Sequence, residues 1–433
     1  MRRTRRARAA LVVVALVIVA GVGGGIVAIT SGPHLTPEQI EAARLHREFV
    51  AEQHAASTAE RLVAAHLPTK TAAPAPLASE PIFTAPLPAH HVVGYVPYWE
   101  LASVQPADVT DASELVYSSV CPAANGSIDP GQPGSDCAHG LADLSSAALA
   151  SLVTAAHAAG DRVLLSVETT NDARIETIDA HAGSVAPVLA ANLAALERTY
   201  GFDGTNIDFE GTNPADREPY VRFARLLTTA LRADVPGGEI LIDTYAAAAA
   251  GSRSFFDPKR LAPLADALFV MNYSLQSNDH GSAGSPLATN DLGYSAVQTL
   301  IEYTKLVPPA KLILGVPFYG FDFETVSGRP GALATAAAPS SQPYRAIVHA
   351  AFPPLWDPTT ETPFSRFVRD GQWHQLWFDD PVSIALKVAL AADFHTAGVG
   401  AWAYGMEDGN ALMLSALTGD RAPLRTPLAR RGS

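Results

Sequence analysis

Cysteine and charge are scarce in this chain of 433 residues. It has two cysteines, and charged residues make up 17% of the sequence. So few cysteines exclude a disulfide-rich scaffold and a zinc site built from four thiolates. Hydrophobic residues nevertheless make up 48%, which excludes a disordered chain. The length suits one large domain with additional segments, or two to three smaller domains.

Positively charged residues are fewer than negatively charged ones. The formal net charge is −13, and five arginines are concentrated in the first eight residues. The remainder is therefore more acidic than the total suggests. An acidic surface repels a phosphate backbone, so we expect no nucleic-acid partner. The histidines and cysteines show no metal-ligand spacing, and we expect neither a metal nor an organic cofactor.

Residues 9–29, directly after these arginines, contain no charged or strongly polar side chain. About 20 apolar residues span a bilayer as a helix, and the arginines would stay on the cytoplasmic side. We therefore predict a cytoplasmic tip and a single transmembrane anchor over 1–32, with the rest of the chain outside the cytoplasm. The alternative is a cleaved signal peptide and a secreted protein, although signal peptides usually have a shorter apolar core of about 7–15 residues.

Three further segments differ in composition. Residues 33–66 are rich in Ala, Glu and Arg and predict a helical stalk, whereas 67–89 hold six prolines and predict an extended linker. Residues 90–418 have the composition of a folded domain and contain all five tryptophans. Residues 419–433 are predicted to be a tail.

The two cysteines, Cys121 and Cys137, are sixteen residues apart in a stretch rich in Gly and Pro. In an exported domain, such a pair predicts a disulfide that closes a short loop. The alternative is two thiols that never meet.

The folded domain alternates strand-like and helix-like segments. The expected strands are 92–98, 114–120, 162–168, 204–210, 239–245, 265–273, 311–318 and 398–404. The expected helices between them include 141–158, 184–199, 214–233, 293–305 and 381–397. Near-continuous apolar strands alternating with helices predict an α/β fold, a (β/α)8 TIM barrel. Residues 321–380 are too long for a simple crossover and predict a small inserted subdomain between strands seven and eight.

The segment Asn206-Ile207-Asp208-Phe209-Glu210 is the most informative one. Side chains alternate along a strand, so the three polar ones share one face, which would point into the barrel. Glu210 would then lie at the carboxyl end of the strand, where barrel enzymes have their active sites. Two neighbouring carboxyl groups resist double ionisation, so one keeps its proton and can act as a general acid. The alternative is a purely structural polar network.

Residues 203–210 resemble the signature Asp-Gly-x-Asp-x-Asp-x-Glu of glycoside hydrolase family 18. Asn206 replaces the middle Asp. Residues 270–274 are similar to the family's sixth-strand Met-x-Tyr-Asp, and 315–320 to its seventh strand. Residues 373–380 and 398–402 resemble the tail of its spore-germination and cortex-lytic branch. The resemblance extends over about 91–410.

This resemblance implies a substrate-assisted hydrolase of β-linked N-acetylglucosamine polymers, either chitin-type or the aminosugar backbone of peptidoglycan. Glu210 would give a proton to the glycosidic oxygen. Asp208 would orient the 2-acetamido group that attacks the anomeric carbon, and Tyr273 would hydrogen-bond to its carbonyl. Trp402 would form the floor beneath the sugar ring.

The resemblance also implies supporting residues. We expect Met271, Asn206 and Tyr95 at the substrate site, and Asp203 in a structural or electrostatic role at the start of its strand. We expect the barrel to be monomeric.

The sequence departs from the family at three points. Besides Asn206, Ser274 replaces an Asp, and residues 166–169 read Ser-Val-Glu-Thr instead of Ser-x-Gly-Gly. These departures keep open a sugar-binding, lectin-like barrel and a scaffold of the cell envelope or of sporulation. The retained Glu210 favours the hydrolase.

Overall fold

The computed structural model describes most of the predicted folded domain. The described residues are 90–110, 112–131, 140–251, 253–288, 294–336 and 338–419. The predicted anchor, stalk, linker and tail lie outside these residues. Within the described part of the chain, no helix is long and apolar enough to span a membrane.

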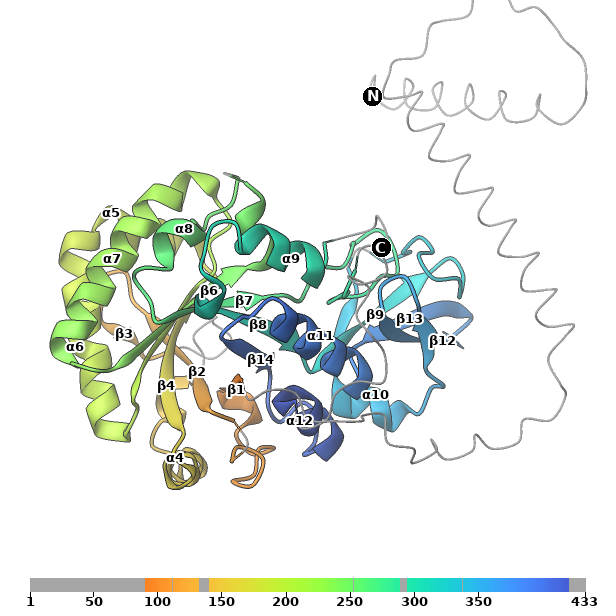
Figure 1. Cartoon of the computed structure of the whole chain (residues 1–433), viewed down its shortest axis with the longest axis horizontal. Coiled ribbons are helices and arrows are strands. Elements are labelled where there is room, and N and C mark those ends of the chain that lie inside the picture. Colours follow the sequence, from red (N-terminus) through yellow and green to blue (C-terminus); the bar gives the residue numbers. More distant parts are fainter. Residues whose placement is uncertain are drawn as a thin grey trace, which may run out of the picture. The chain divides into compact units, whose positions relative to one another are not determined.

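Eight parallel strands form a closed barrel (Figure 1). They are β1 (His91–Pro97), β2 (Glu114–Pro122), β4 (Arg162–Thr169), β5 (Gly204–Phe209), β6 (Glu239–Tyr245), β7 (Ala267–Met271), β8 (Leu312–Pro317) and β14 (Gly398–Trp402). The ring is closed because β1 pairs with both β2 and β14. The short strand β3 (Ile128–Asp129) is added antiparallel to β2. The predicted eight-stranded barrel is therefore confirmed, and each expected strand overlaps an observed one.

Helices follow most of the barrel strands. The α-helices outside the insertion are α3 (Gly140–Asp143), α4 (Ala147–Ala159), α5 (Asp172–Ala180), α6 (Ala182–Tyr200), α7 (Arg217–Asp234), α8 (Pro258–Leu261), α9 (Ala296–Tyr303), α11 (Pro381–Asp393) and α12 (Ala411–Thr418). The 3-10 turns are η1 (Tyr98–Glu100), η2 (Pro214–Asp216), η3 (Ala246–Ala250) and η4 (Pro309–Lys311). The sequence did not predict α5, a short, polar helix in which Ile175 and Ile178 are the buried apolar residues.

The strands bury apolar side chains on both faces. One cluster fills the barrel and includes Tyr95 and Phe269, and a larger cluster packs between the strands and the surrounding helices. Phe269 fits inside because Gly315 and Gly400 face its ring. A Cβ atom at these two glycines would lie 2.8 and 2.6 Å from ring atoms of Phe269. The two-sided burial explains why the strands read as continuous apolar runs.

An antiparallel sheet is inserted between β8 and α11 (Figure 1). Its strands are β9 (Tyr319–Thr325), β10 (Ser340–Pro343), β11 (Leu355–Asp357), β12 (Thr362–Arg369) and β13 (Gln372–Phe378), and it also carries α10 (Tyr344–Ala350). Phe321, Phe364 and Trp377 pack in its own small core. Where the chain leaves the insertion, the carboxylate of Asp379 pairs with Lys387 of α11, and both side chains are buried.

Candidate active site

The polar face of β5 points into the barrel, as its alternation predicts. Ile207 and Phe209 belong to the outer apolar layer. Asn206 and Asp208 lie on the opposite face and are buried. Glu210 follows β5 directly at its carboxyl end and is partly exposed. This end of a parallel barrel is where the loops build active sites.

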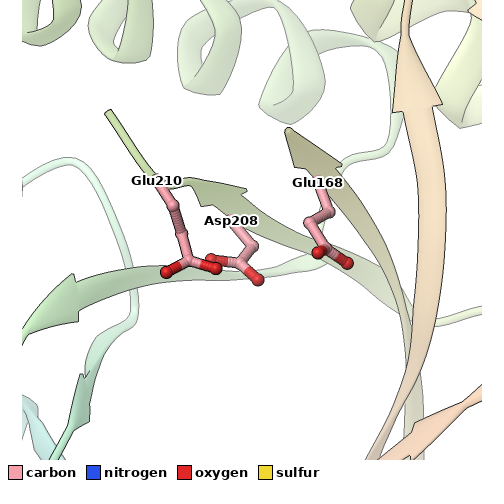
Figure 2. A group of neighbouring side chains, drawn as sticks. All are labelled: Glu168, Asp208 and Glu210. Carbon is pink, nitrogen blue, oxygen red and sulfur yellow. The ribbon is translucent and has the colours of Figure 1, made fainter. Parts of the chain in front are cut away.

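Three carboxylates converge at this point (Figure 2). Glu168, from the end of the neighbouring strand β4, joins Asp208 and Glu210, and one oxygen atom of each lies within 4.8 Å of the other two. Two serines of β2 donate hydrogen bonds to Oε2 of Glu168: Ser119 at 2.6 Å and Ser118 at 3.2 Å. A cluster of acids does not by itself define a metal site, and we assign none here.

This crowding changes the protonation of the acids. Burial and, to a smaller extent, the charge of the nearby Glu168 together raise the pKa of Glu210 to about 7. Burial also raises the pKa of Asp208 well above its usual range, with smaller contributions from Asp243, Glu210 and Glu168. A carboxyl group that keeps its proton near neutral pH can act as a general acid.

A fourth carboxylate, that of Asp243 on β6, is buried near Asp208. It accepts the hydroxyl of Tyr95 at 2.8 and 2.9 Å and the side-chain amide of Asn206 at 2.6 Å. Asn206 and Tyr95 are themselves 0% exposed, so they support the carboxylates from within the barrel and do not line an open surface. Asp243 was missed from sequence. The available signal was an acid in the middle of the predicted strand 239–245, after three apolar residues.

Tyr273 stands just beyond β7, and Met271 ends that strand with its side chain in the barrel interior. The Tyr273 ring lies 6.1 Å from that of Tyr319, the first residue of the inserted sheet. The hydroxyl of Ser274 is 2.9 Å from the hydroxyl of Tyr319. The serine that departs from the family motif therefore connects the barrel to the insertion.

Aromatic rings line one side of the barrel mouth. Trp402 ends β14, and its ring centroid lies 5.6 Å from that of Tyr95 and 6.2 Å from that of Trp99. Trp99, in η1, is 51% exposed, which is unusual for such a large apolar side chain. Aromatic faces suit the apolar C–H faces of pyranose rings. The sequence predicted Trp402 at the site but not Trp99.

A cavity of about 680 Å³ lies on the other side, beside Glu210. Gly211 and Thr212, which follow Glu210, line it together with Tyr245, Arg253 and Phe255. A Cβ atom at Gly211 would lie 2.6 Å from the ring of Phe255, so this position needs a glycine. The cavity is large enough to hold part of an oligosaccharide.

Asp203 is far from this chemistry. It precedes β5 at its amino end, whereas Glu210 follows the carboxyl end. Its carboxylate accepts the backbone N–H of Val163 at 2.8 Å and lies 2.9 Å from Nε2 of His157. The first contact joins the starts of the neighbouring strands β4 and β5, and the second connects β5 to helix α4.

The cysteines lie away from the carboxylates. Cys121 is on β2 and is disulfide-bonded. Cys137 lies outside the described residues, so the predicted bridge between them stays a prediction.

Comparison with known proteins gives one family and several relatives. The model of the family described as "Glycosyl hydrolases family 18" matches residues 91–407. The chain is 30% identical over 221 residues to the provisionally named sporulation-specific glycosylase YdhD of Bacillus subtilis (strain 168), covering 49% of this chain and 50% of that protein. It is 27% identical over 280 residues to human di-N-acetylchitobiase, covering 58% and 69% of the two chains. The match to YdhD thus spans only half of that protein's length.

Solved structures show the same fold. The Bacillus cereus spore cortex-lytic enzyme SleL superposes with a TM-score of 0.62 and 18% identity, covering 78% of this chain and 75% of that chain. A Cycas revoluta GH18 chitinase in complex with (GlcNAc)3 superposes with a TM-score of 0.64 and 19% identity, covering 76% and 98%.

Proposed function

The chain belongs to family 18 of the glycosyl hydrolases, and on this premise we propose that it hydrolyses polymers of β-linked N-acetylglucosamine. The observation that carries the proposal is Glu210, a carboxyl group with a pKa of about 7 at the carboxyl end of β5, next to Asp208. Chitin-type chains and the aminosugar backbone of peptidoglycan both contain the required linkage.

In the proposed reaction, the 2-acetamido oxygen of the substrate attacks the anomeric carbon. The glycosidic C–O bond breaks, and its oxygen takes the proton of Glu210. Asp208 orients the acetamido group and stabilises the positive charge of the oxazolinium ion, while Tyr273 donates to the acetamido carbonyl. Water then opens the oxazolinium ion and returns a proton to Glu210, which gives net retention at the anomeric carbon.

Stereochemistry and substrate choice test this mechanism. An ordinary retaining glycosidase places a nucleophilic carboxylate about 5–5.5 Å from the acid, a separation that Asp208 or Glu168 could imitate. If the substrate supplies the nucleophile, substrates without a 2-acetamido group are inert and a thiazoline mimic of the oxazolinium ion inhibits. Release of the α-anomer first from a β-linked substrate, observed by NMR before mutarotation, would contradict substrate assistance.

The two sides of the mouth suggest how a polymer binds. Trp402 and Trp99 offer stacking faces for sugars on one side of Glu210. The cavity behind Gly211 and Arg253 would receive the leaving part of the chain on the other side.

A digestion panel tests the function. Chitin oligomers and purified peptidoglycan are incubated with the protein and the products identified by mass spectrometry, with Glu210→Gln as the matched control. The variant removes the proton and keeps the shape, so we expect turnover to be lost and binding to be kept. Asp208→Asn should also lose most activity. Binding without turnover by the unmodified protein would favour the lectin-like barrel instead.

We further propose that the protein is anchored in the cell membrane by residues 9–29, with the barrel as an extracytoplasmic monomer. The apolar run after the arginines supports the anchor. Membrane fractionation and N-terminal sequencing of the mature protein test it. A soluble product that begins after residue 28 would indicate signal cleavage and secretion.

A further inference from the structure

Glu168 is the feature of the site that the proposed mechanism does not use. It stands where the family's third-strand motif carries glycine, so a carboxylate occupies space that a hydrogen atom would otherwise fill. β4 aligns Glu168 with Asp208 in the register of the neighbouring strand β5. The side chain is partly exposed, and its oxygen reaches within 4.8 Å of oxygens of Asp208 and Glu210 (Figure 2).

β2 is shaped to hold this carboxylate. The register between β2 and β4 shifts between Tyr117 and Val120, which marks a bulge at the two intervening serines. Successive residues of a regular strand point to opposite faces, whereas a bulge can turn both to one side. Ser118 and Ser119 accordingly both donate to the same oxygen of Glu168, at 3.2 and 2.6 Å. Hydroxyl donors stabilise the charged form of a carboxylate.

We propose that Glu168 is a positioning residue whose negative charge, held by Ser118 and Ser119, keeps the proton on Glu210. This inference rests on the proposed role of Glu210 as the general acid. A fixed charge a few ångströms away disfavours a second charge, so the acid stays loaded at a pH where an isolated glutamic acid would have lost its proton. Burial and the charge of Glu168 are the two causes that raise the pKa of Glu210.

Other titratable groups also face Glu210. They are Asp208 on β5, Asp243 and Tyr245 on β6, Tyr273 after β7 and Tyr319 on β9. Burial raises the pKa of each of these groups, which favours their neutral forms. Among the described residues, no pair of serines donates to any of these groups as Ser118 and Ser119 donate to Glu168.

The test is the pH dependence of kcat/KM on a chitin oligomer for the full chain and for Glu168→Gln. Glutamine keeps the volume and an acceptor oxygen for the serines but removes the charge. Because burial is the larger of the two causes that raise the pKa of Glu210, we expect the high-pH limb of the profile to move down by up to about one pH unit. Glu176→Gln, which removes a charge from an exposed position on α5, is the control and should leave the limb in place.

Ser119→Ala is a second variant that leaves the carboxylate in position. It removes the shorter of the two hydrogen bonds, so we expect a smaller shift of the limb in the same direction. A Glu168→Gln variant that loses rate at all pH values while its limb stays in place would overturn the proposal, because this is the signature of a merely structural residue.

A readout without turnover separates this inference from the proposed function. Thermal unfolding of the full chain, Glu168→Gln, Glu210→Gln and the double variant forms a double-mutant cycle. The two charges repel only when both are present, so we expect coupling in Tm at pH 8–9 and none at pH 5. If Glu168 and Glu210 are coupled in a protein that hydrolyses no substrate, the proposed function is rejected and the inference about Glu168 is kept. If the two residues show no coupling in Tm at pH 8–9, the inference is overturned.

Discussion

Tyr95 donates its hydroxyl to both oxygens of the Asp243 carboxylate, at 2.8 and 2.9 Å, inside the barrel. The amide of Asn206 donates to the same carboxylate at 2.6 Å. The acid absent from position 206 of the polar face of β5 therefore has a counterpart on the adjacent strand. Asp243 supplies a carboxylate beside Asp208, and Asn206 connects the two strands.

This arrangement predicts the outcome of moving the carboxylate between the strands. Asn206→Asp places a second acid against Asp243, so we expect a lower Tm, with a larger loss at pH 8 than at pH 5 because both acids then tend to ionise. Asp243→Asn keeps one acceptor oxygen but replaces the other, which Tyr95 also contacts, with an NH2 group and removes the charge, so it should cost about 1–3 kcal/mol. The double variant restores one acid and one amide, and should regain stability and activity relative to either single variant. Tm and kcat/KM are measured for the two single variants and the double variant. If the effects of the two single substitutions simply add in the double variant, the two positions do not exchange roles.

Activity should fall above neutral pH. The pKa of Glu210 is raised to about 7, so the acid is protonated and competent below that value and loses its proton above it. We expect kcat/KM to decline about tenfold per pH unit above this point. Glu210→Gln should be slower by at least about 100-fold and show no such limb. A constant rate up to pH 9 would remove Glu210 from the role of acid.

Trp99 should matter for long substrates. Its exposed ring lies beside Trp402 at the mouth, and Trp99→Ala would remove a stacking face without touching the carboxylates. We expect KM to rise by about 3–10-fold for long oligosaccharides, with kcat nearly unchanged. Val188→Ala, at an exposed position on α6, is the matched control. An equal loss on disaccharide and hexasaccharide substrates would count against a remote sugar site.

Asp179 should make the fold less stable at high pH. Its carboxylate is buried on α5, no hydrogen-bond partner is found for either oxygen among the described residues, and burial raises its pKa to about 8. Because this value exceeds the unfolded value of about 3.9, the free energy of unfolding falls as pH rises from about 4 to about 8. Asp179→Asn should raise Tm by about 2–6 °C at pH 9 and have little effect at pH 4. Asp234→Asn, at an exposed position, serves as control, and a pH-independent difference would show that the ionisation of Asp179 is not involved.

Arg253 can discriminate between the two substrate classes. It lines the cavity beside Glu210, where the other lining residues that the structure describes carry no charge. The lactyl carboxyl group of muramic acid is amide-linked to the stem peptide in intact peptidoglycan and is a free carboxylate where that peptide has been removed. Chitin oligomers are neutral. If the leaving sugar is muramic acid, Arg253→Gln should raise KM by about 2–5-fold for peptidoglycan fragments from which the stem peptide has been removed and leave it unchanged for chitin oligomers. Equal effects on both substrates would exclude charge recognition in this cavity.

The sequence predicted what depends on local periodicity. Continuous apolar runs located the barrel strands, and the alternation along β5 placed Asp208 and Glu210 on the inward face. Contacts between strands could not be predicted from the sequence, because they depend on the register of the strands and on closure of the barrel. Asp243 and Tyr95, which form a hydrogen bond, are 148 residues apart in the sequence. Ser119 contacts Glu168 because of a bulge in β2, and no residue pattern predicted that bulge. Trp99 was missed because its exposure depends on the neighbouring loops.

The inserted sheet begins and ends at the same place. Gly320 of β9 pairs with Phe378 of β13, so the chain enters and leaves the insertion side by side. A shorter connection could therefore join the two ends. Tyr344 and Ile347 of α10, however, pack in the larger core of the barrel, and Arg345 pairs with Glu100 of η1. The insertion is thus partly a small domain of its own and partly a section of the barrel's outer layer, and a redesign would have to keep these contacts.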